Sequence, residues 1–340
     1  MSSRVALSEI FPTDQRHMHL RASALRARLP ERIRSLAGSV DAAVCNPPFI
    51  MPRWRAEYMD ILIEAGFANL PAVTRDIEAP AIFLAQNMRI LSDGAPLGII
   101  LPDSVISSQR YRWFRQSLLE NYQVTRVVKL PRTSFRGTDA LAHIVIIEKR
   151  APTGAHIELC RFSGGCVMDV CLVGINDALD RLDVDFHTAR NNIESSSGCR
   201  DSLAERGVDV RRGSIEQAVA RKSAIRAFHT TDIHVESLGQ WIDLPFETSH
   251  RGVAETCVRA EAGDILIARV GRNFDTKIVG VRSGKVLLTD CVYRVRAPKK
   301  ERRGLLRNLS SPEGQAWLRS QAYGVGATHI SKASLLQFSY

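Results

Sequence analysis

The sequence predicts an α/β fold for the first part of the chain and a smaller, mostly β domain for the last part. In residues 1–150, apolar strand-like runs alternate with segments whose apolar residues recur at helical spacing. This alternation is typical of an α/β layer with a largely parallel sheet. In residues 237–340, short strand-like runs are separated by turns. The 340 residues are more than one small module needs, so we expect two or three domains.

The elements of the first part follow from apolar spacing and from turn residues. Residues 79–91 predict a helix, because their apolar side chains recur at helical spacing and Pro80 suits a first turn. Asp93 and Gly94 then turn the chain into a strand at 97–101. The other predicted elements are helices at 30–36 and 111–121 and strands at 40–45, 124–130 and 142–148.

A less regular connecting region is expected at residues 151–236, before the mostly β domain at 237–340. Within the connecting region, residues 195–198 suit a linker and residues 218–228 a basic helix. Ser311 can cap a late helix that has Pro312 at its first position. The elements expected in the last domain are strands at 265–270, 277–281, 286–288 and 292–295 and helices at 304–309 and 311–321.

The composition excludes several classes of protein. A hydrophobic share of 45% with 24% charged residues is ordinary for a globular chain and unlike disordered, collagen-like or membrane proteins. The apolar runs are strand-sized and too short for a membrane span, and the N-terminus has no apolar segment typical of a secretory signal. We therefore expect a cytoplasmic protein that acts without a membrane.

Basic residues exceed acidic ones, with 46 Lys and Arg against 36 Asp and Glu and a net charge of +10. This excess favours a polyanionic partner, nucleic acid first. Seven cysteines are an odd number, and none forms a C-x-x-C pair. We expect reduced, mostly buried thiols and no metal site.

The strongest chemical signal is the tetrapeptide Asn46-Pro47-Pro48-Phe49, which directly follows a predicted buried strand. Ligands of open α/β sheets bind at such carboxyl ends of strands. The prolines lack N–H groups, so the turn presents carbonyl acceptors without competing donors, and the Asn46 side chain adds an amide oxygen. These acceptors can hold both hydrogens of an exocyclic amino group as its nitrogen attacks an electrophilic methyl group. Phe49 offers a flat face to a flipped-out base, a contact worth about 1–3 kcal/mol.

The tetrapeptide resembles the Asp/Asn/Ser-Pro-Pro-Tyr/Phe/Trp motif of amino-methyltransferases that use S-adenosylmethionine (AdoMet). In that family the methyl group passes directly to adenine N6 or cytosine N4. Residues 82–106 and 129–149 resemble later segments of the adenine methylase subunits of type I restriction systems, so the resemblance covers residues 40–150. A strand-terminating Asn-Pro turn is the structural alternative.

The resemblance implies a fold and a base pocket. The fold would be part of the Rossmann-like sheet of a class I AdoMet-dependent methyltransferase, with residues 1–150 forming the C-terminal part of the catalytic domain. Asn46 to Phe49 would be catalytic, Phe135 would form the second wall of the base pocket, and Thr138 would lie nearby. A core aromatic at a strand end is the alternative for Phe135.

The AdoMet-binding part of the family pattern is missing from the sequence. Gly38 is the sole glycine among the 45 residues before Asn46, so the cofactor-binding residues are unknown. Asp14 alone could mark an upstream family motif. Without the first strands of the sheet, the strand at 40–45 would have an unpaired apolar edge. We expect AdoMet to be the cofactor and a protein partner to supply the half that binds it. An upstream segment absent from this reading frame and a degenerate domain are the alternatives.

Residues 257–281, 288–296 and 309–335 resemble the target-recognition domains of type I specificity subunits, and residues 181–186 resemble the Arg-Leu-Asp opening of such a module. The resemblance implies contact with double-stranded DNA, in which Arg can read guanine edges and Lys meets phosphate. A solvated basic face is the alternative for each cation. The candidate DNA-binding residues are Arg269, Arg272, Lys277, Arg282, Lys285, Thr328 and His329.

Two functions from different classes remain open. The first is a site-specific adenine-N6 DNA methyltransferase of a restriction-modification or phage-defence system, acting on a flipped-out adenine. The second is a non-enzymatic DNA-recognition subunit on a degenerate methylase scaffold. The tetrapeptide also suits methylation of ribosomal RNA guanine or protein glutamine, but the long tail after residue 151 favours DNA. Asn rather than Ser at position 46 favours adenine over cytosine.

Overall fold

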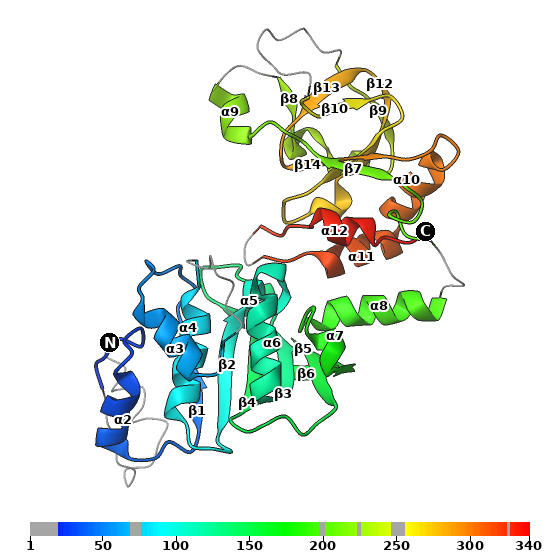
Figure 1. The fold of residues 1–340 in the computed structure, drawn as a ribbon. Helices are drawn as coiled ribbons and strands as arrows, with labels where there is room; N and C mark the ends of the chain where they lie inside the picture. The colour runs from blue at the N-terminus through cyan, green and yellow to red at the C-terminus, as the bar shows by residue number, and fades with distance from the viewer. Residues whose placement is uncertain (1–19, 69–75, 197–200, 223–225, 246–255, 325–326) are drawn as a thin grey trace.

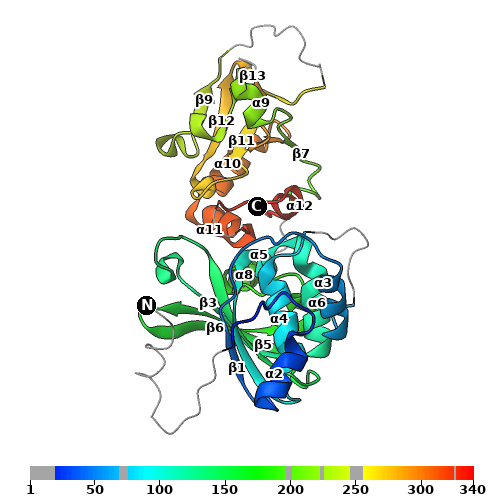
Figure 2. The same ribbon diagram turned by 90° about the vertical axis from the view of Figure 1, so that its left-hand side faces the viewer.

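A computed structural model describes residues 20–68, 76–196, 201–222, 226–245, 256–324 and 327–340. Figure 1 shows two bodies, an α/β body formed by the first half of the chain and a mostly β body formed by the second half. Helices of the second body lie between its strands and the α/β body (Figures 1 and 2). Asp14, the one upstream candidate, lies outside the described residues.

The α/β body is built on one six-stranded sheet. Its spatial order is β1-β2-β4-β3-β5-β6. Strand β1 is parallel to β2, and β3 is parallel to β5, whereas β4 runs antiparallel to both β2 and β3. The strands are β1 (Ala43–Cys45), β2 (Pro96–Pro102), β3 (Gln123–Lys129), β4 (Ala142–Glu148), β5 (His156–Ser163) and β6 (Cys166–Gly174).

The prediction of a largely parallel sheet is wrong, because the sheet is mixed. Strand β4 returns from β3 through residues 130–141 without a crossover helix, and such a connection joins antiparallel strands. In the sheet β4 lies between β2 and β3, and it pairs antiparallel with both. Strand β6 also pairs antiparallel with β5. The α/β class is confirmed, since helices still cover the sheet (Figure 2).

The predicted helices of the first part form within one or two residues of their expected bounds. Ile82 in α4, Leu97 in β2 and Phe114 in α6 are fully buried in one core, together with other apolar side chains of the sheet. The helices are α2 (Leu29–Ala37), α3 (Glu57–Glu64), α4 (Ala79–Ile90), α5 (Asp103–Ser107), α6 (Arg112–Asn121), α7 (Ile175–Ala178) and α8 (Val184–Ser196). Short 3₁₀ turns lie at Gln109–Tyr111 and Arg132–Ser134.

Strand β1 forms one edge of the sheet. Within the described residues it pairs with β2 alone. Val44, in the middle of the strand, is 92% exposed, and the apolar side chains of Ile50 and Met51 beyond it are exposed as well. The expected apolar strand edge is therefore present in this part of the chain.

The second body contains two sheets. The five-stranded sheet has the order β7-β14-β11-β12-β9, and the three-stranded sheet has the order β10-β13-β8. The strands are β7 (Asp209–Arg212), β8 (Ala227–Phe228), β9 (Trp241–Asp243), β10 (Arg259–Glu261), β11 (Ile265–Ala268), β12 (Ile278–Ser283), β13 (Lys285–Leu288) and β14 (Val292–Arg296). We call this body, residues 201–340, the second domain.

Four helices complete the described part of the second domain. They are α9 (Gln217–Lys222), α10 (Arg302–Ser310), α11 (Pro312–Gln321) and α12 (Lys332–Leu336), with 3₁₀ turns at Thr230–Asp232, Val235–Ser237 and Phe274–Thr276. Ser311 caps α11 as predicted, because its side chain accepts a hydrogen bond from the Gly314 N–H at 3.1 Å. Leu305 in α10 and Leu318 in α11 pack in one core with apolar side chains of the five-stranded sheet.

The connecting region contributes to both bodies. Strands β5 and β6 extend the first sheet beyond residue 150, and β7 belongs to the five-stranded sheet. Of the predicted linker at 195–198, residues 195 and 196 end helix α8 and the other two lie outside the described residues. The predicted basic helix at 218–228 is wrong at its end, because α9 ends at Lys222 and residues 227 and 228 form strand β8.

Two further expectations concern cysteines and membranes. Of the six cysteines within the described residues, Cys160 alone is buried and Cys166 is exposed, so the expectation of mostly buried thiols is wrong. Cys166 is exposed because it lies at the start of the edge strand β6. In the described parts of the chain, no helix is long and apolar enough to cross a membrane.

Candidate functional site

The turn Asn46 to Phe49 lies directly after β1. Because β1 and β2 are parallel, the turn lies on the side of the sheet where the carboxyl end of β2 also lies. Pro47 is buried, whereas Asn46 and Pro48 are exposed. The turn is fixed by backbone hydrogen bonds. The Ile50 N–H donates to the Pro48 carbonyl at 3.0 Å, and the Ala79 N–H at the start of α4 donates to the Ile50 carbonyl at 2.9 Å. The Asn46 side chain is thus held at the surface by a rigid turn.

The structure brings Phe49 and Phe135 together, although 85 residues separate them in the sequence. Their ring centroids lie 6.3 Å apart at an interplanar angle of 67°, an edge-to-face contact. Both side chains are half-buried. Because the rings contact each other, a base can enter between them only when the loop that carries Phe135 moves aside.

The loop at residues 130–141, which carries Phe135, also contacts the second domain. Thr138 is exposed, and its hydroxyl accepts a hydrogen bond from the Ala140 N–H at 3.2 Å. The next residue, Asp139, forms an ion pair of 2.7 Å with Arg272 of the second domain. The candidate base pocket is therefore joined to a candidate DNA-binding residue by one ion pair.

The other candidate cations make contacts within the second domain. Arg269 Nε donates to the Asp290 carbonyl at 2.8 Å, and Lys277 Nζ donates to the Thr230 carbonyl at 2.7 Å. The remaining two form exposed ion pairs, Arg282 with Asp243 at 2.7 Å and Lys285 with Glu261 at 3.0 Å.

Thr328 and His329 lie beside the segment that carries Arg272, and both residues have structural contacts. The buried Thr328 hydroxyl donates to the Gly271 carbonyl at 2.6 Å. His329 pairs with Tyr323 through two backbone hydrogen bonds of 2.8 and 3.0 Å. The structure thus gathers Arg272, Thr328 and His329 in one loop region near the base pocket.

The sequence did not predict the polar contacts that connect the two bodies. Arg181, 3% exposed, donates three hydrogen bonds to the carbonyls of Ser320, Gln321 and Ala322 at the end of α11. The Asp103 carboxylate accepts a hydrogen bond from the Gly324 N–H at 2.8 Å. We call these contacts the domain joint. The Arg-Leu-Asp resemblance at residues 181–186 marked its position in the sequence but not its role.

Beneath the joint lies a buried charge cluster. Lys129 Nζ donates to both oxygens of Asp183 at 2.9 Å and to Asp185 at 2.7 Å. Burial opposes the charge of Lys129, but the two carboxylates raise its pKa. His143 is fully buried, and neither ring nitrogen has a hydrogen-bond partner among the described residues.

Potential metal-ligating atoms of Asp103, His143 and Asp183 lie within 4.8 Å of one another. Lys129 already neutralises Asp183 with its ammonium group. A divalent ion would have to compete with that ammonium for the same carboxylate oxygens. We therefore assign the three residues to the charge cluster.

The charge cluster predicts opposite pH dependences for two variants. Burial and the neighbouring Asp183 raise the pKa of Asp103 to about 6, and burial lowers the pKa of His143 to about 4. The contribution of Asp103 to the stability of the folded chain therefore decreases as the pH rises towards 6. The contribution of His143 decreases as the pH falls from about 6.5 towards 4. The two effects oppose each other in the unaltered chain.

We expect the stability of Asp103→Asn, relative to the unaltered chain, to increase between pH 4 and 6. That of His143→Gln should decrease over the same range. Urea denaturation at pH 4.5, 5.5 and 6.5 measures both differences. Equal slopes for the two variants would contradict the raised pKa of Asp103 and the lowered pKa of His143.

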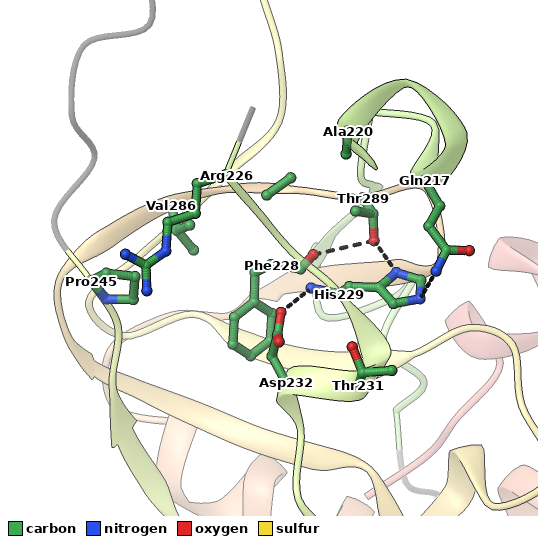
Figure 3. Close-up of a pocket in the computed structure, with 11 residues that line it drawn as sticks. Gln217, Ala220, Arg226, Phe228, His229, Thr231, Asp232, Pro245, Val286 and Thr289 are labelled. Carbon is green, nitrogen blue, oxygen red and sulfur yellow. Dashed lines mark hydrogen bonds between the residues drawn. The ribbon is translucent and has the colours of Figure 1, made fainter. Parts of the chain in front are cut away.

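Figure 3 shows a pocket of about 440 Å³ in the second domain, beside β8 and β13. Phe228, Pro245 and Val286 form its apolar walls, and Arg226 and Asp232 carry its charges. The ring of His229 is fixed by hydrogen bonds of 2.8 Å with Thr289 and with Gln217. These contacts hold the pocket wall in place and do not bring a candidate catalytic residue into it.

Comparison with known proteins gives a family match for part of the chain. Residues 16–163 match the N-6 DNA methylase family. This stretch contains β1, the turn Asn46 to Phe49 and the loop that carries Phe135. A search of curated proteins gave no match to the chain.

Solved structures resemble both bodies together. The chain is similar to the type IIL restriction-modification enzyme MmeI, whose structure is a complex with DNA, with 13% identity over 93% of this chain and 48% of that one and a TM-score of 0.51. It is similar to the type IIG restriction endonuclease BpuSI, with 14% identity over 88% and 47% of the two chains and a TM-score of 0.40.

A shorter match is a type I methyltransferase subunit from Streptococcus thermophilus, with 20% identity over 53% and 36% of the two chains and a TM-score of 0.34. The chain spans about half the length of MmeI and BpuSI. The likeness to MmeI shows that the two bodies together share the fold of the matching part of that enzyme.

Proposed function

We propose that the chain is the catalytic and DNA-recognising part of a site-specific adenine-N6 DNA methyltransferase of a restriction-modification or phage-defence system. The observation that carries the proposal is the position of Phe49 and Phe135 in contact beside the exposed Asn46, on a domain that matches the N-6 DNA methylase family. In the proposal the second domain is the target-recognition domain and binds double-stranded DNA.

The proposal gives each turn residue a role. The Asn46 side-chain oxygen and the Pro47 carbonyl accept the two hydrogens of the adenine amino group, and Pro48 stiffens the turn. Phe49 and Phe135 stack on the flipped-out base after the Phe135 loop opens. AdoMet supplies the electrophilic methyl group when it is bound.

The described residues fit only part of an AdoMet site. They include the strand end at Asn46, whereas among the described residues before β1 the single glycine is Gly38. We propose that the AdoMet-binding half is supplied by another polypeptide segment that pairs with the β1 edge, where Val44 is 92% exposed. Pairing there would extend the sheet and cover this apolar side chain.

Arg272 places the recognition domain beside the base pocket in this proposal. The Arg272 side chain is 69% exposed while it pairs with Asp139. A DNA phosphate can compete for such an exposed pair, because exposed ion pairs are worth only about 0–1 kcal/mol. DNA binding and opening of the Phe135 loop would then be coupled through one side chain.

A non-enzymatic recognition subunit is the second candidate, favoured by the absence of a Gly-rich loop among the described residues before β1. Calorimetric titration of AdoMet separates the two candidates. It would be made on the chain alone and on the chain with the products of neighbouring reading frames. We expect no binding to the chain alone and binding with a partner.

Binding to the chain alone would contradict the split site. Absence of binding in every combination, with DNA affinity retained, would select the non-enzymatic function. DNA binding is measured separately by gel shift. This measurement distinguishes a failure of DNA binding from a failure of cofactor binding.

A further inference from the structure

The turn that leads into α10 of the second domain presents two lysines to solvent. The Glu301 N–H donates a hydrogen bond to the Pro298 carbonyl at 2.9 Å, which closes a four-residue turn. Lys299 and Lys300 occupy the two central positions of this turn, and both are exposed. The turn thus carries two adjacent positive charges at its tip.

Helix α10 carries two further cations on the face that points away from the core. Leu305, Leu306 and Leu309 are buried in the domain, whereas Arg303 and Arg307 are exposed. Residues four apart lie on one side of a helix, about 6 Å apart along its axis. The two arginines therefore extend the charge of the lysine turn along the helix. We call Lys299, Lys300, Arg303 and Arg307 the α10 basic surface.

The fold supplies little negative charge to the α10 basic surface. Within the part of the chain that the structure describes, none of its four cations forms an ion pair or a side-chain hydrogen bond. The one carboxylate between residues 298 and 310 is that of Glu301, and it accepts a hydrogen bond from the Tyr340 hydroxyl at 2.8 Å. The remaining cation of the segment, Arg302, is held by the Ala297 carbonyl at 3.0 Å.

The positions of these charges do not favour the helix itself. Arg303 and the two lysines before it bring positive charge to the helix end that is itself positive, and the first turn contains no acidic residue. Arg307 in the last turn has a favourable position for a cation, but it repels Arg303 four residues earlier. Most of this charge therefore opposes the stability of α10, and a negatively charged partner would relieve it.

We propose that the α10 basic surface binds the phosphate backbone of DNA. Phosphates follow one another along a strand, so a row of exposed cations can contact more than one of them. Such contacts position a protein on DNA without reading its sequence. The inference rests on the proposed function and adds a second contact to the one proposed for Arg272. Figure 1 shows α10 at one side of the second domain.

Two matched pairs of substitutions test the proposal. Arg303→Gln with Arg307→Gln removes two cations of the α10 basic surface. Arg28→Gln with Arg32→Gln is the control, because these arginines are also exposed, have the same spacing and form no ion pair among the described side chains. They lie at the start of α2, at the end of the α/β body that points away from the second domain (Figures 1 and 2).

The dissociation constant is measured over a series of salt concentrations for two DNA duplexes of unrelated sequence. We expect the salt slope of the α10 variant to fall by about two, one for each lost phosphate contact, with about ten-fold weaker binding of both duplexes. The control should keep the slope of the unaltered chain. Because all four substituted residues are exposed, the melting temperatures should stay close to that of the unaltered chain.

Equal changes in the two double variants would overturn the proposal, since a general loss of positive charge would then explain both. A loss confined to one duplex would also overturn it, because a backbone contact is independent of sequence. If the α10 variant does not fold, Lys299→Gln with Lys300→Gln replaces it, since these residues lie in an exposed turn outside the helix.

Failure of the inference is distinguishable from failure of the proposed function. If the unaltered chain binds neither duplex, the proposed DNA recognition fails and the inference fails with it. If the unaltered chain binds both duplexes and the α10 variant keeps its salt slope, the recognition function stands and the α10 basic surface is not a DNA contact. An acidic protein surface would then be the partner that fits its charge.

Discussion

Replacement of Asn46 by Ala should lower methyl transfer by about 100- to 1,000-fold without weakening DNA binding. The expected size is that of losing one preorganised hydrogen-bonding group at a reacting centre. Asn46 is exposed and lies in a turn fixed by the backbone bonds of Ile50, so the fold should tolerate the change. Transfer of tritium from labelled AdoMet to DNA measures the rate in the preparation that binds AdoMet.

The conservative variant Asn46→Asp is the control, because a carboxylate retains an acceptor oxygen at the same position. It should keep a measurable part of the activity that Asn46→Ala loses. If both variants are as active as the unaltered chain, Asn46 does not hold the amino group. If both lose DNA binding, the turn has a structural role instead.

Replacement of Lys129 by Met should destabilise the chain by about 3–5 kcal/mol. The change leaves the Asp183 carboxylate, whose side chain is 4% exposed, buried without its cation, and breaking a buried pair from one side has this cost. Urea denaturation followed by circular dichroism measures the loss.

The same substitution at Lys149 is the matched control. Lys149 pairs with Asp93, which is 94% exposed, and the cost should stay below about 1 kcal/mol. Addition of Asp183→Asn to Lys129→Met should recover part of the lost stability, because it removes the unpaired charge. Equal losses at Lys129 and Lys149 would show that the charge cluster does not stabilise the fold.

Local sequence signals predicted several elements of the α/β body, although not α3, α5, β5 or β6. The strand at 142–148 has the predicted bounds, and α4 ends within one residue of its expected end. Apolar spacing reports which faces of an element are buried, but it carries no information on strand direction. The antiparallel course of β4 therefore escaped prediction, since it depends on which neighbours the strand meets in space.

The candidate site was predictable only where its chemistry is local. The turn Asn46 to Phe49 carries its signal in four consecutive residues, whereas the domain joint connects residues far apart, such as Asp103 and Gly324 at a separation of 221 residues. Thr328 shows the same limit. Its residue type suits DNA contact, but the structure uses its hydroxyl to fix the Gly271 carbonyl. Whether a polar group is already satisfied cannot be read from a sequence pattern.

The domain joint has a consequence for how this chain can diversify. Arg181 and Asp103 hold the second domain by the backbone atoms of Ser320, Gln321, Ala322 and Gly324, not by their side chains. Most substitutions at these positions of the second domain would leave such backbone contacts unchanged. Under the proposed function, new recognition surfaces could therefore be combined with an unchanged α/β body, as long as the end of α11 and Gly324 keep their backbone course.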